Sequence, residues 1–320
     1  MVDAHFGLGY RQKKNRYEDG ESMKLVSFKR AGRVRIGAIT EDGAEVVDFS
    51  IAAPRLPGDM SSFIEGGDKA LAVAAKALTT RKKDARIPHK RAKVIAPIPM
   101  PRRNIICVGK NYYEHAKEFD ASGFNATADA SAIPTDPIIF SKANTTVCGP
   151  GDEIPAYLDH SKSTDYEVEL AVIIGTGGRG ISKRNAMKHV YGYTIVNDVT
   201  ARVLQQQHKQ WFIGKNIDNY CPMGPYLATA DEIANIKKAR IQAHINGELR
   251  QNSVVKDLIF DIPTLISTLS KGMTLIPGDI IATGTPAGVG IGFKPPIFLK
   301  KGDICTLSID GLGTLENPVG

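Results

Sequence analysis

The N-terminal part of the chain alternates hydrophobic and polar residues with a period of two. Strand-like runs occupy residues 24–28, 33–39 and 45–48. The turn residues Glu41-Asp42-Gly43 precede the last run, and this combination predicts a small antiparallel sheet. Residues 61–77 then have the spacing of one or two helices. We therefore expect a small β-rich N-terminal domain over residues 23–100.

Strand-like runs also dominate the chain beyond the proline-rich stretch 95–101, which cannot be helical. These runs lie at 104–108, 138–140, 167–174, 192–197, 241–245, 279–283 and 304–309. Short helices are expected at 111–119, 183–190, 201–206 and 262–271. Asn246-Gly247 has the chemistry of a type I′ hairpin turn. Because helices and strands do not alternate regularly, we expect a β-rich α+β domain over residues 101–320, with residues 1–22 as an N-terminal extension.

Composition narrows the class of protein. The 320 residues are 42% hydrophobic and 23% charged, an ordinary globular balance. The net charge of +7 is concentrated in residues 11–35 and 81–93, where we expect solvated basic faces and no nucleic-acid partner. Four scattered cysteines without a C-x-x-C pair are typical of a reduced, cytoplasmic protein. The sequence shows neither a secretory signal in residues 1–20 nor an apolar run of membrane-spanning length.

Two carboxylates interrupt the apolar strand predicted at 167–174. Side chains alternate across a strand, so Glu167 and Glu169 share one face, about 6.6 Å apart along the backbone. Two such charges are unfavourable unless a cation lies between them, and Mg²⁺ and Mn²⁺ prefer carboxylate oxygens. Asp198, at the end of the apolar strand 193–197, would supply a third ligand. The sequence therefore predicts a divalent metal site.

The glycines of residues 175–180 match G-x-G-x-x-G and suggest a dinucleotide site. A pyrophosphate there would lie close to the two acids of the preceding strand. Ser182 is also a good helix N-cap, which places the helix start after the glycines rather than within them. We therefore favour a glycine turn between a strand and a helix.

Three further segments carry candidate chemistry. His115 and Glu118 are three residues apart on a predicted helix, where a carboxylate can orient an imidazole as a general base. Residues 120–134 after them have the composition of a mobile lid, and we expect residues 115–135 to be poorly ordered or open without ligand. Lys215 lies among turn formers and could bind an anion. The glycine loop 283–290 offers backbone N–H groups and the Thr285 hydroxyl to a carboxylate.

Five motifs in this order resemble the fumarylacetoacetate hydrolase family, across residues 101 to about 318. They are Cys107-Val108-Gly109-Lys110-Asn111-Tyr112 with His115 and Glu118, Asp165-Tyr166-Glu167-Val168-Glu169-Leu170, Asn197-Asp198-Val199-Thr200-Ala201-Arg202, the run 215–225, and Thr283-Gly284-Thr285-Pro286-Ala287-Gly288-Val289-Gly290. The chain looks similar to the acylpyruvase-like and 2-hydroxyhepta-2,4-diene-1,7-dioate isomerase-like members. Residues 24–100 resemble the variable N-terminal domain of many members.

The resemblance implies a mixed β-sandwich roll, one Mg²⁺ or Mn²⁺ ion per active site, a homodimer and a role in aromatic catabolism. By position, Glu167, Glu169 and Asp198 look like the metal ligands. His115 and Glu118 look like the catalytic dyad, on a helix that orders when substrate binds, and Lys215 looks like the active-site lysine. The positions that look like substrate contacts are Lys110, Gln205, Gly284 and Thr285.

The departures from the family pattern bear on the substrate. Lys110 stands where several members have arginine, which replaces a planar fork with a point charge. Val203 stands where an acidic residue often occurs, and Asn216 and Asn219 replace smaller hydroxyl residues. The metal and dyad positions are unchanged.

We therefore expect a metal-dependent hydrolase that cleaves 2,4-dioxo acids of the acylpyruvate or fumarylpyruvate type. His115 would activate water for attack on C4, Lys215 would stabilise the charge on oxygen, and pyruvate would be released. The same site suits an alternative, an oxaloacetate decarboxylase or tautomerase or a 2-oxo acid hydratase or isomerase. A metal-binding protein without turnover is a further alternative from a different class.

Overall fold

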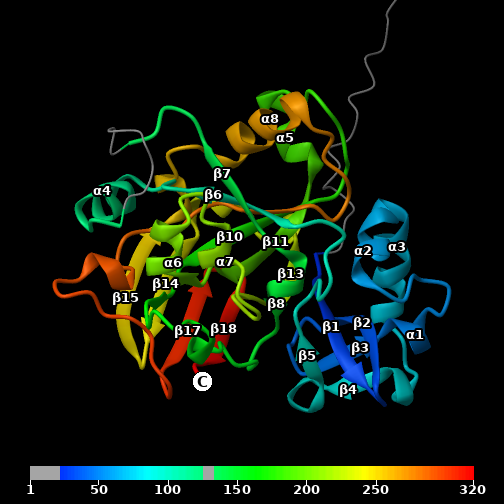
Figure 1. Cartoon of the computed structure of the whole chain (residues 1–320). Helices are drawn as coiled ribbons and strands as arrows, with labels where there is room; N and C mark the ends of the chain where they lie inside the picture. The colour runs from blue at the N-terminus through cyan, green and yellow to red at the C-terminus, as the bar shows by residue number, and fades with distance from the viewer. Residues whose placement is uncertain (1–21, 125–132) are drawn as a thin grey trace, which may run out of the picture.

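The computed structural model describes residues 22–124 and 133–320, and a twelve-stranded mixed sheet runs through this part of the chain (Figure 1). Its strands are β1 Lys24–Arg30, β2 Arg33–Ile39, β3 Glu45–Asp48, β4 Arg86–Pro88, β5 Lys93–Ile95, β6 Ile105–Gly109, β7 Ile138–Lys142, β8 Val147–Cys148, β10 Val168–Ile174, β11 Val190–Asn197, β13 Cys221–Thr229 and β16 Ile280–Ala282. The order is β4-β3-β2-β1-β13-β11-β10-β16-β6-β7, with β5 beside β1 and β8 beside β13.

Two smaller sheets complete the β-structure of the described residues. One pairs β9 Thr164–Asp165 with β12 Thr200–Ala201, and the other has the order β15-β14-β17-β18. Its strands are β14 Arg240–Ile245, β15 Glu248–Val254, β17 Ile304–Ile309 and β18 Gly313–Pro318. The predicted β-rich α+β fold is confirmed.

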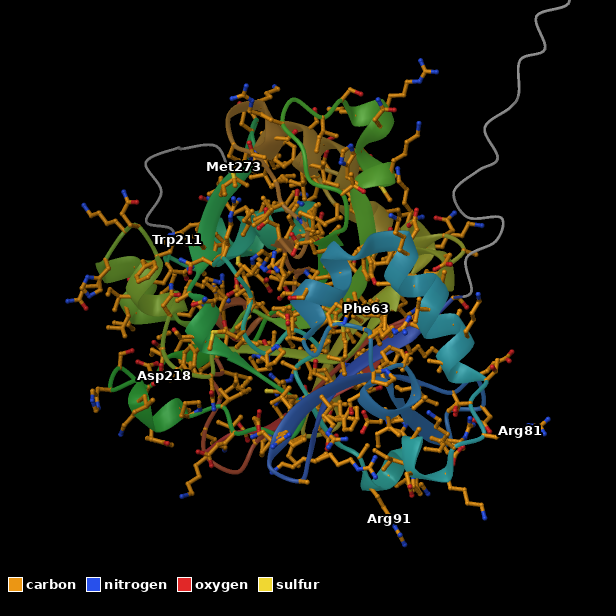
Figure 2. All side chains as sticks on the ribbon, turned by 90° about the vertical axis from the view of Figure 1, so that its right-hand side faces the viewer. Phe63, Arg81, Arg91, Trp211, Asp218 and Met273 are labelled. Atoms are coloured by element: carbon orange, nitrogen blue, oxygen red, sulfur yellow. The ribbon has the colours of Figure 1, made fainter. Side chains whose placement is uncertain are left out.

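The helices are short and lie around the sheets (Figure 1). They are α1 Phe49–Ala52, α2 Met60–Glu65, α3 Gly67–Leu78, α4 Tyr113–Ala121, α5 Lys183–Ala186, α6 Arg202–Gln207, α7 Phe212–Lys215 and α8 Ile262–Gly272. Within the described residues no helix is long and apolar enough to cross a membrane. Arg81 and Arg91 point outward from the surface in Figure 2, as expected of solvated basic faces.

Most predicted elements form within two or three residues of their expected bounds, with clear exceptions. The helix expected at 183–190 ends at Ala186, and a 3₁₀ turn leads from it into β11. The strand β13 was not predicted, because Pro222, Gly224 and Pro225 suggest a loop. It forms because its residues pair with β1 on one side and β11 on the other, with a register shift in the β11 ladder. The strand β18 was also missed.

The β14–β15 hairpin confirms the predicted turn chemistry. Asn246 and Gly247 have φ values of 53° and 81°, the positive pair that a type I′ turn requires.

Two of the predicted segments fall mainly outside the described residues. They are the extension 1–22, except for its last residue, and residues 125–132 of the expected lid. The first part of the 115–135 segment forms the end of α4.

The N-terminal segment is joined to the rest of the protein through backbone pairing. β1 pairs with β13 at Lys24↔Ala228 and Leu25↔Leu227. One hydrophobic cluster also contains Phe63 of α2 together with Ala171 and Ile173 of β10. The domain boundary near residue 100 therefore stays a prediction about chain organisation, while the sheet crosses it without a break.

Both faces of β10 are buried, and alternate residues face different cores. Leu170, Val172 and Ile174 belong to one hydrophobic cluster, whereas Ala171 and Ile173 belong to the other. By the same alternation Glu169 lies on the Ala171 face. The strand is thus held on both sides, which fixes the direction of its acidic side chain.

The glycine turn 175–180 is a structural feature and not a dinucleotide site. The helix after it begins at Lys183, beyond the glycines, and β10 has antiparallel neighbours on both sides. A Cβ at Gly177 would lie 2.5 Å from the carbonyl oxygen of Leu275, so this position accommodates close backbone packing.

The close approach of β11 to β13 yields a stability prediction. A Cβ at Gly192 would lie 2.0 Å from the Ala228 carbonyl oxygen, so Gly192→Ala must displace the strands. We expect a loss of about 1–3 kcal/mol in the free energy of unfolding, measured by urea denaturation. Gly272→Ala is the control, because nothing lies within 4 Å of its added Cβ and α8 accepts alanine. Equal midpoints for Gly192→Ala and the wild type would contradict this packing.

Candidate active site

Strand pairing brings the three predicted metal ligands together. Glu169 lies in β10 and Glu167 directly precedes that strand, while Asp198 follows β11. The Asp198 N–H donates to the Glu167 carbonyl oxygen at 2.9 Å, which holds the two chain segments side by side. One oxygen from each of the three carboxylates lies within 4.8 Å of the others, and all three residues are buried.

Three buried cationic side chains contact this triad. Lys215 Nζ lies 2.8 Å from Glu167 Oε2 and 2.7 Å from Asp198 Oδ2. Arg202 Nη2 lies 2.6 Å from Glu167 Oε1. Lys142 Nζ lies 2.9 Å from Asp198 Oδ1. Such pairing is necessary because an isolated carboxylate in a protein interior costs several kcal/mol.

The acids differ in their electrostatic surroundings. Burial raises the pKa of Glu169 well above its ordinary value, and the charges of Asp198 and Glu167 raise it further. Burial also tends to raise the pKa of Glu167, but the positive charges of Arg202 and Lys215 outweigh it and hold that pKa below the ordinary value. Among the described residues no cationic side chain forms an ion pair with Glu169. A divalent cation would supply that positive charge, so this all-carboxylate donor set fits Mg²⁺ or Mn²⁺.

The predicted base lies on α4, separate from the strands that carry the acids. His115 Nδ1 lies 3.1 Å from Glu118 Oε2, and His115 is buried. Glu118 Oε1 accepts the N–H of Gly288 at 2.9 Å. A Cβ at Gly292 would lie 1.9 Å from the same oxygen, so the glycine at this position leaves room for the carboxylate. Both oxygens of Glu118 are therefore engaged, which fixes the orientation of the imidazole.

The predicted substrate contacts surround the same pocket. Lys110, Gln205 and Thr285 line it together with His115, Glu167, Glu169, Arg202 and Lys215. Gln205 Oε1 accepts from Arg202 Nη1 at 3.2 Å, and Thr285 Oγ1 accepts from Gln251 Nε2 at 2.7 Å. The Gly284 N–H donates to Glu169 Oε2 at 2.9 Å, so in this structure it supports an acid of the triad.

Aromatic side chains form one wall of the pocket. Trp211, the sole tryptophan of the sequence, lies 6.1 Å from Phe119 and 5.2 Å from Phe140 between ring centroids. All three side chains line the pocket, and Figure 2 shows Trp211 far from Phe63 of the N-terminal segment. This wall links α4, which carries His115, to the segment that leads into Lys215.

Sequence reasoning missed Trp211 and the roles of Lys142 and Arg202. A signal for Lys142 was present, because it ends the apolar strand β7 much as Asp198 follows β11. Arg202 lay inside a recognised motif, but only the tertiary contacts show that it pairs with Glu167 and with Asp165.

Comparisons with known proteins agree with this geometry. Residues 104–320 match the fumarylacetoacetate (FAA) hydrolase C-terminal family. An oxaloacetate tautomerase of Bacillus subtilis (strain 168) is 45% identical over 310 residues, which cover 93% of this chain and 100% of that protein.

Two solved structures have the same fold. A fumarylacetoacetate hydrolase from the psychrophilic Exiguobacterium antarcticum has a TM-score of 0.77 at 40% identity and covers 93% of this chain and 99% of its own. A maleylpyruvate hydrolase from Sphingobium sp. SYK-6, in complex with a manganese(II) ion and pyruvate, has a TM-score of 0.73 at 30% identity, with 93% and 98% covered. These matches and the carboxylate triad support an enzyme that uses a divalent metal ion. The chain belongs to the fumarylacetoacetate hydrolase family.

Proposed function

We propose that this protein is a divalent-metal-dependent oxaloacetate tautomerase, which interconverts the enol and keto forms of that 2-oxo diacid. The observation that carries the proposal is the position of His115, which is buried, is oriented by Glu118 and lines the same pocket as Glu167 and Glu169. Keto–enol conversion needs a cation to hold the 2-oxo acid and a base to move one proton. The name of the Bacillus subtilis relative supports the same assignment. We thus favour the tautomerase, which the sequence left open as an alternative, over an enzyme that cleaves 2,4-dioxo acids.

In the proposed site Glu167, Glu169 and Asp198 hold one Mg²⁺ or Mn²⁺ ion. When bound, that ion supplies Lewis-acid chemistry at the 2-oxo acid end of the substrate. Lys215, which already contacts two of these acids, stabilises negative charge that develops on the 2-oxygen. Burial strengthens these interactions because the surrounding dielectric is low.

His115 transfers the proton at C3 in this proposal. Its Nδ1 is engaged by Glu118, so Nε2 is the ring nitrogen that exchanges a proton with the substrate. In the keto-to-enol direction one proton leaves C3 for Nε2, and the protonated His115 then gives a proton to the 2-oxygen, which leaves the imidazole neutral again. The reverse direction returns a proton to C3, and neither direction consumes water. Lys110, Gln205 and Thr285 are proposed to bind the substrate carboxylates.

Cleavage of 2,4-dioxo acids is the second candidate, because a maleylpyruvate hydrolase shares the fold. In that reaction His115 would activate a water molecule for attack on C4. The open space in the pocket is about 20 Å³, close to what one water needs. Binding of a four-carbon acid therefore requires less movement of the pocket side chains than binding of a longer acylpyruvate.

Four further expectations stay predictions. They are the homodimer, the cytoplasmic location, a role in aromatic catabolism and the lid over residues 120–134.

The two reactions can be separated with purified protein. With added Mg²⁺ or Mn²⁺ we expect the protein to accelerate the loss of the ultraviolet absorbance of enol-oxaloacetate. EDTA should abolish this acceleration. We expect no more pyruvate from oxaloacetate or from acylpyruvates than in a protein-free control with the same metal ion, which excludes enzymatic decarboxylation and C–C hydrolysis. Pyruvate released from acylpyruvates, with oxaloacetate tautomerising only at its uncatalysed rate, would overturn the proposal in favour of the hydrolase.

The base assignment predicts a large kinetic effect of His115→Gln. Loss of a positioned general base lowers kcat by about 10²–10⁴-fold, and we expect Mn²⁺ affinity to stay unchanged. His160→Gln is the matched control, because that histidine is exposed and lies outside the pocket. A His115→Gln enzyme with kcat within threefold of the wild type would show that another group moves the proton.

The metal site predicts that Glu169→Gln weakens metal binding without lowering the stability of the metal-free protein. Removing a ligand should weaken Mn²⁺ binding by at least about tenfold, measured by fluorescence of Trp211 or by calorimetry. Without metal, the variant should melt at the same or a higher temperature, because burial raises the pKa of Glu169 and its charge is unfavourable in the folded protein. The exposed Glu41→Gln is the control for both measurements. Unchanged Mn²⁺ affinity in Glu169→Gln would remove Glu169 from the ligand set.

A further inference from the structure

Asp165 and Tyr166 directly precede Glu167 of the carboxylate triad, yet neither of them lines the catalytic pocket. Both side chains are buried. They hydrogen-bond to residues 288–292 (the loop end), the last part of the segment that begins with the glycine loop. Two buried polar side chains are thus directed at a loop rather than at the pocket beside them, and this arrangement needs an explanation.

Asp165 accepts N–H groups with both of its carboxylate oxygens. Oδ1 accepts from Gly290 at 2.7 Å and from the neighbouring Tyr166 at 2.9 Å. Oδ2 accepts from Ile291 at 3.2 Å and from Arg202 Nε at 2.8 Å. A carboxylate can serve both pairs because its oxygens only accept, whereas an asparagine would turn its NH₂ group toward one of the pairs. The four donors therefore require an acid at this position.

Gly288 of the loop end is held from two directions. Its carbonyl oxygen accepts the Tyr166 hydroxyl at 2.9 Å, and its N–H donates to Glu118 Oε1 at 2.9 Å. Its φ is 104°, and an added Cβ would collide with the Arg250 carbonyl oxygen, so the position requires glycine. The N–H group that orients Glu118 is therefore itself placed by Tyr166 and by the backbone of β15.

Hydrophobic packing joins the loop end to the helix that carries the proposed base. Val289 and Ile291 are buried in one cluster with Phe119 of α4 and with Trp211. A shift of the loop end would therefore move an N–H group away from Glu118 and disturb the packing of α4. Misplacement of a reacting group by about 1 Å can lower a rate by about 10²-fold.

We propose that Asp165 and Tyr166 are positioning residues for the His115–Glu118 dyad, although neither lines the pocket. They hold the loop end in the place where the Gly288 N–H fixes Glu118, and Glu118 in turn orients the imidazole. This inference rests on the proposed role of His115 as the base. It adds two residues to the proton-transfer machinery that the pocket itself does not reveal.

The variant Tyr166→Phe tests the inference through the loss of one hydroxyl group. We expect kcat for enol-oxaloacetate to fall by about three- to tenfold, with KM and Mn²⁺ affinity within about twofold of the wild type, because only the dyad is displaced. Tyr220→Phe is the matched control, since its hydroxyl is also buried but pairs with Thr164 Oγ1 rather than with the loop end. Equal kcat values for these two variants would overturn the inference.

The variant Asp165→Asn should lower kcat more, by at least about tenfold, because it disturbs two N–H groups of the loop end. Asp48→Asn is its control: Asp48 is equally buried, pairs with two arginines and accepts a backbone N–H, but it lies in the N-terminal segment. Both variants should lose stability, and only Asp165→Asn should lose kcat below its melting temperature. A kcat loss in Asp165→Asn without one in Tyr166→Phe would assign the effect to Arg202 and overturn the inference.

Hydrogen exchange followed by mass spectrometry tests the positioning without an assay of turnover. In Tyr166→Phe, and in Asp165→Asn if it folds, we expect exchange at least about tenfold faster in residues 113–121 and 288–292, with α3 unchanged. Unchanged exchange in both segments would overturn the inference. If the wild type did not accelerate tautomerisation, the proposed function would fail by itself, and the exchange rates alone would decide whether the two residues hold the dyad.

Discussion

The burial of three carboxylates within a few ångströms of one another is the constraint on which the rest of this site depends. Removing a carboxylate from water costs several kcal/mol, and neighbouring like charges add to that cost. Lys215, Arg202 and Lys142 offset part of it through ion pairs with Glu167 and Asp198. Glu169 keeps a raised pKa, from burial first and then from its acidic neighbours. The electrostatic surroundings thus point to a further positive charge, which is the chemistry of a divalent metal site.

The proposed base is held by a different part of the fold. His115 lies on α4, and its partner Glu118 is fixed by the Gly288 N–H. The acids come instead from β10 and from the end of β11. Phe119 of α4 packs against Trp211, which precedes the helix that carries Lys215, the partner of Glu167 and Asp198. The imidazole and the carboxylate triad are therefore held by separate elements that meet at one pocket, so each group can be oriented without disturbing the other.

The large sheet gives these elements their relative positions. β10 lies inside the sheet with both faces covered, so Glu169 cannot turn toward solvent. The N-terminal segment contributes to this burial, because β1 extends the sheet beyond β13 and the N-terminal helices cover one face. A segment that supplies no pocket residue thereby helps to set the low dielectric around the triad.

The sequence by itself determined the local features: the strand periods, the hairpin at Asn246-Gly247, the paired acids Glu167 and Glu169, and the His115–Glu118 spacing. These follow from side-chain alternation, turn chemistry and helix geometry, which act over a few residues. The tertiary structure alone decided the ion pairs of Lys142 and Arg202, the use of the Gly284 N–H by Glu169, and the pairing of β1 with the proline-containing β13. Those contacts join residues far apart in the chain, and their free energy comes from burial and charge pairing that exist only once the sheet has formed.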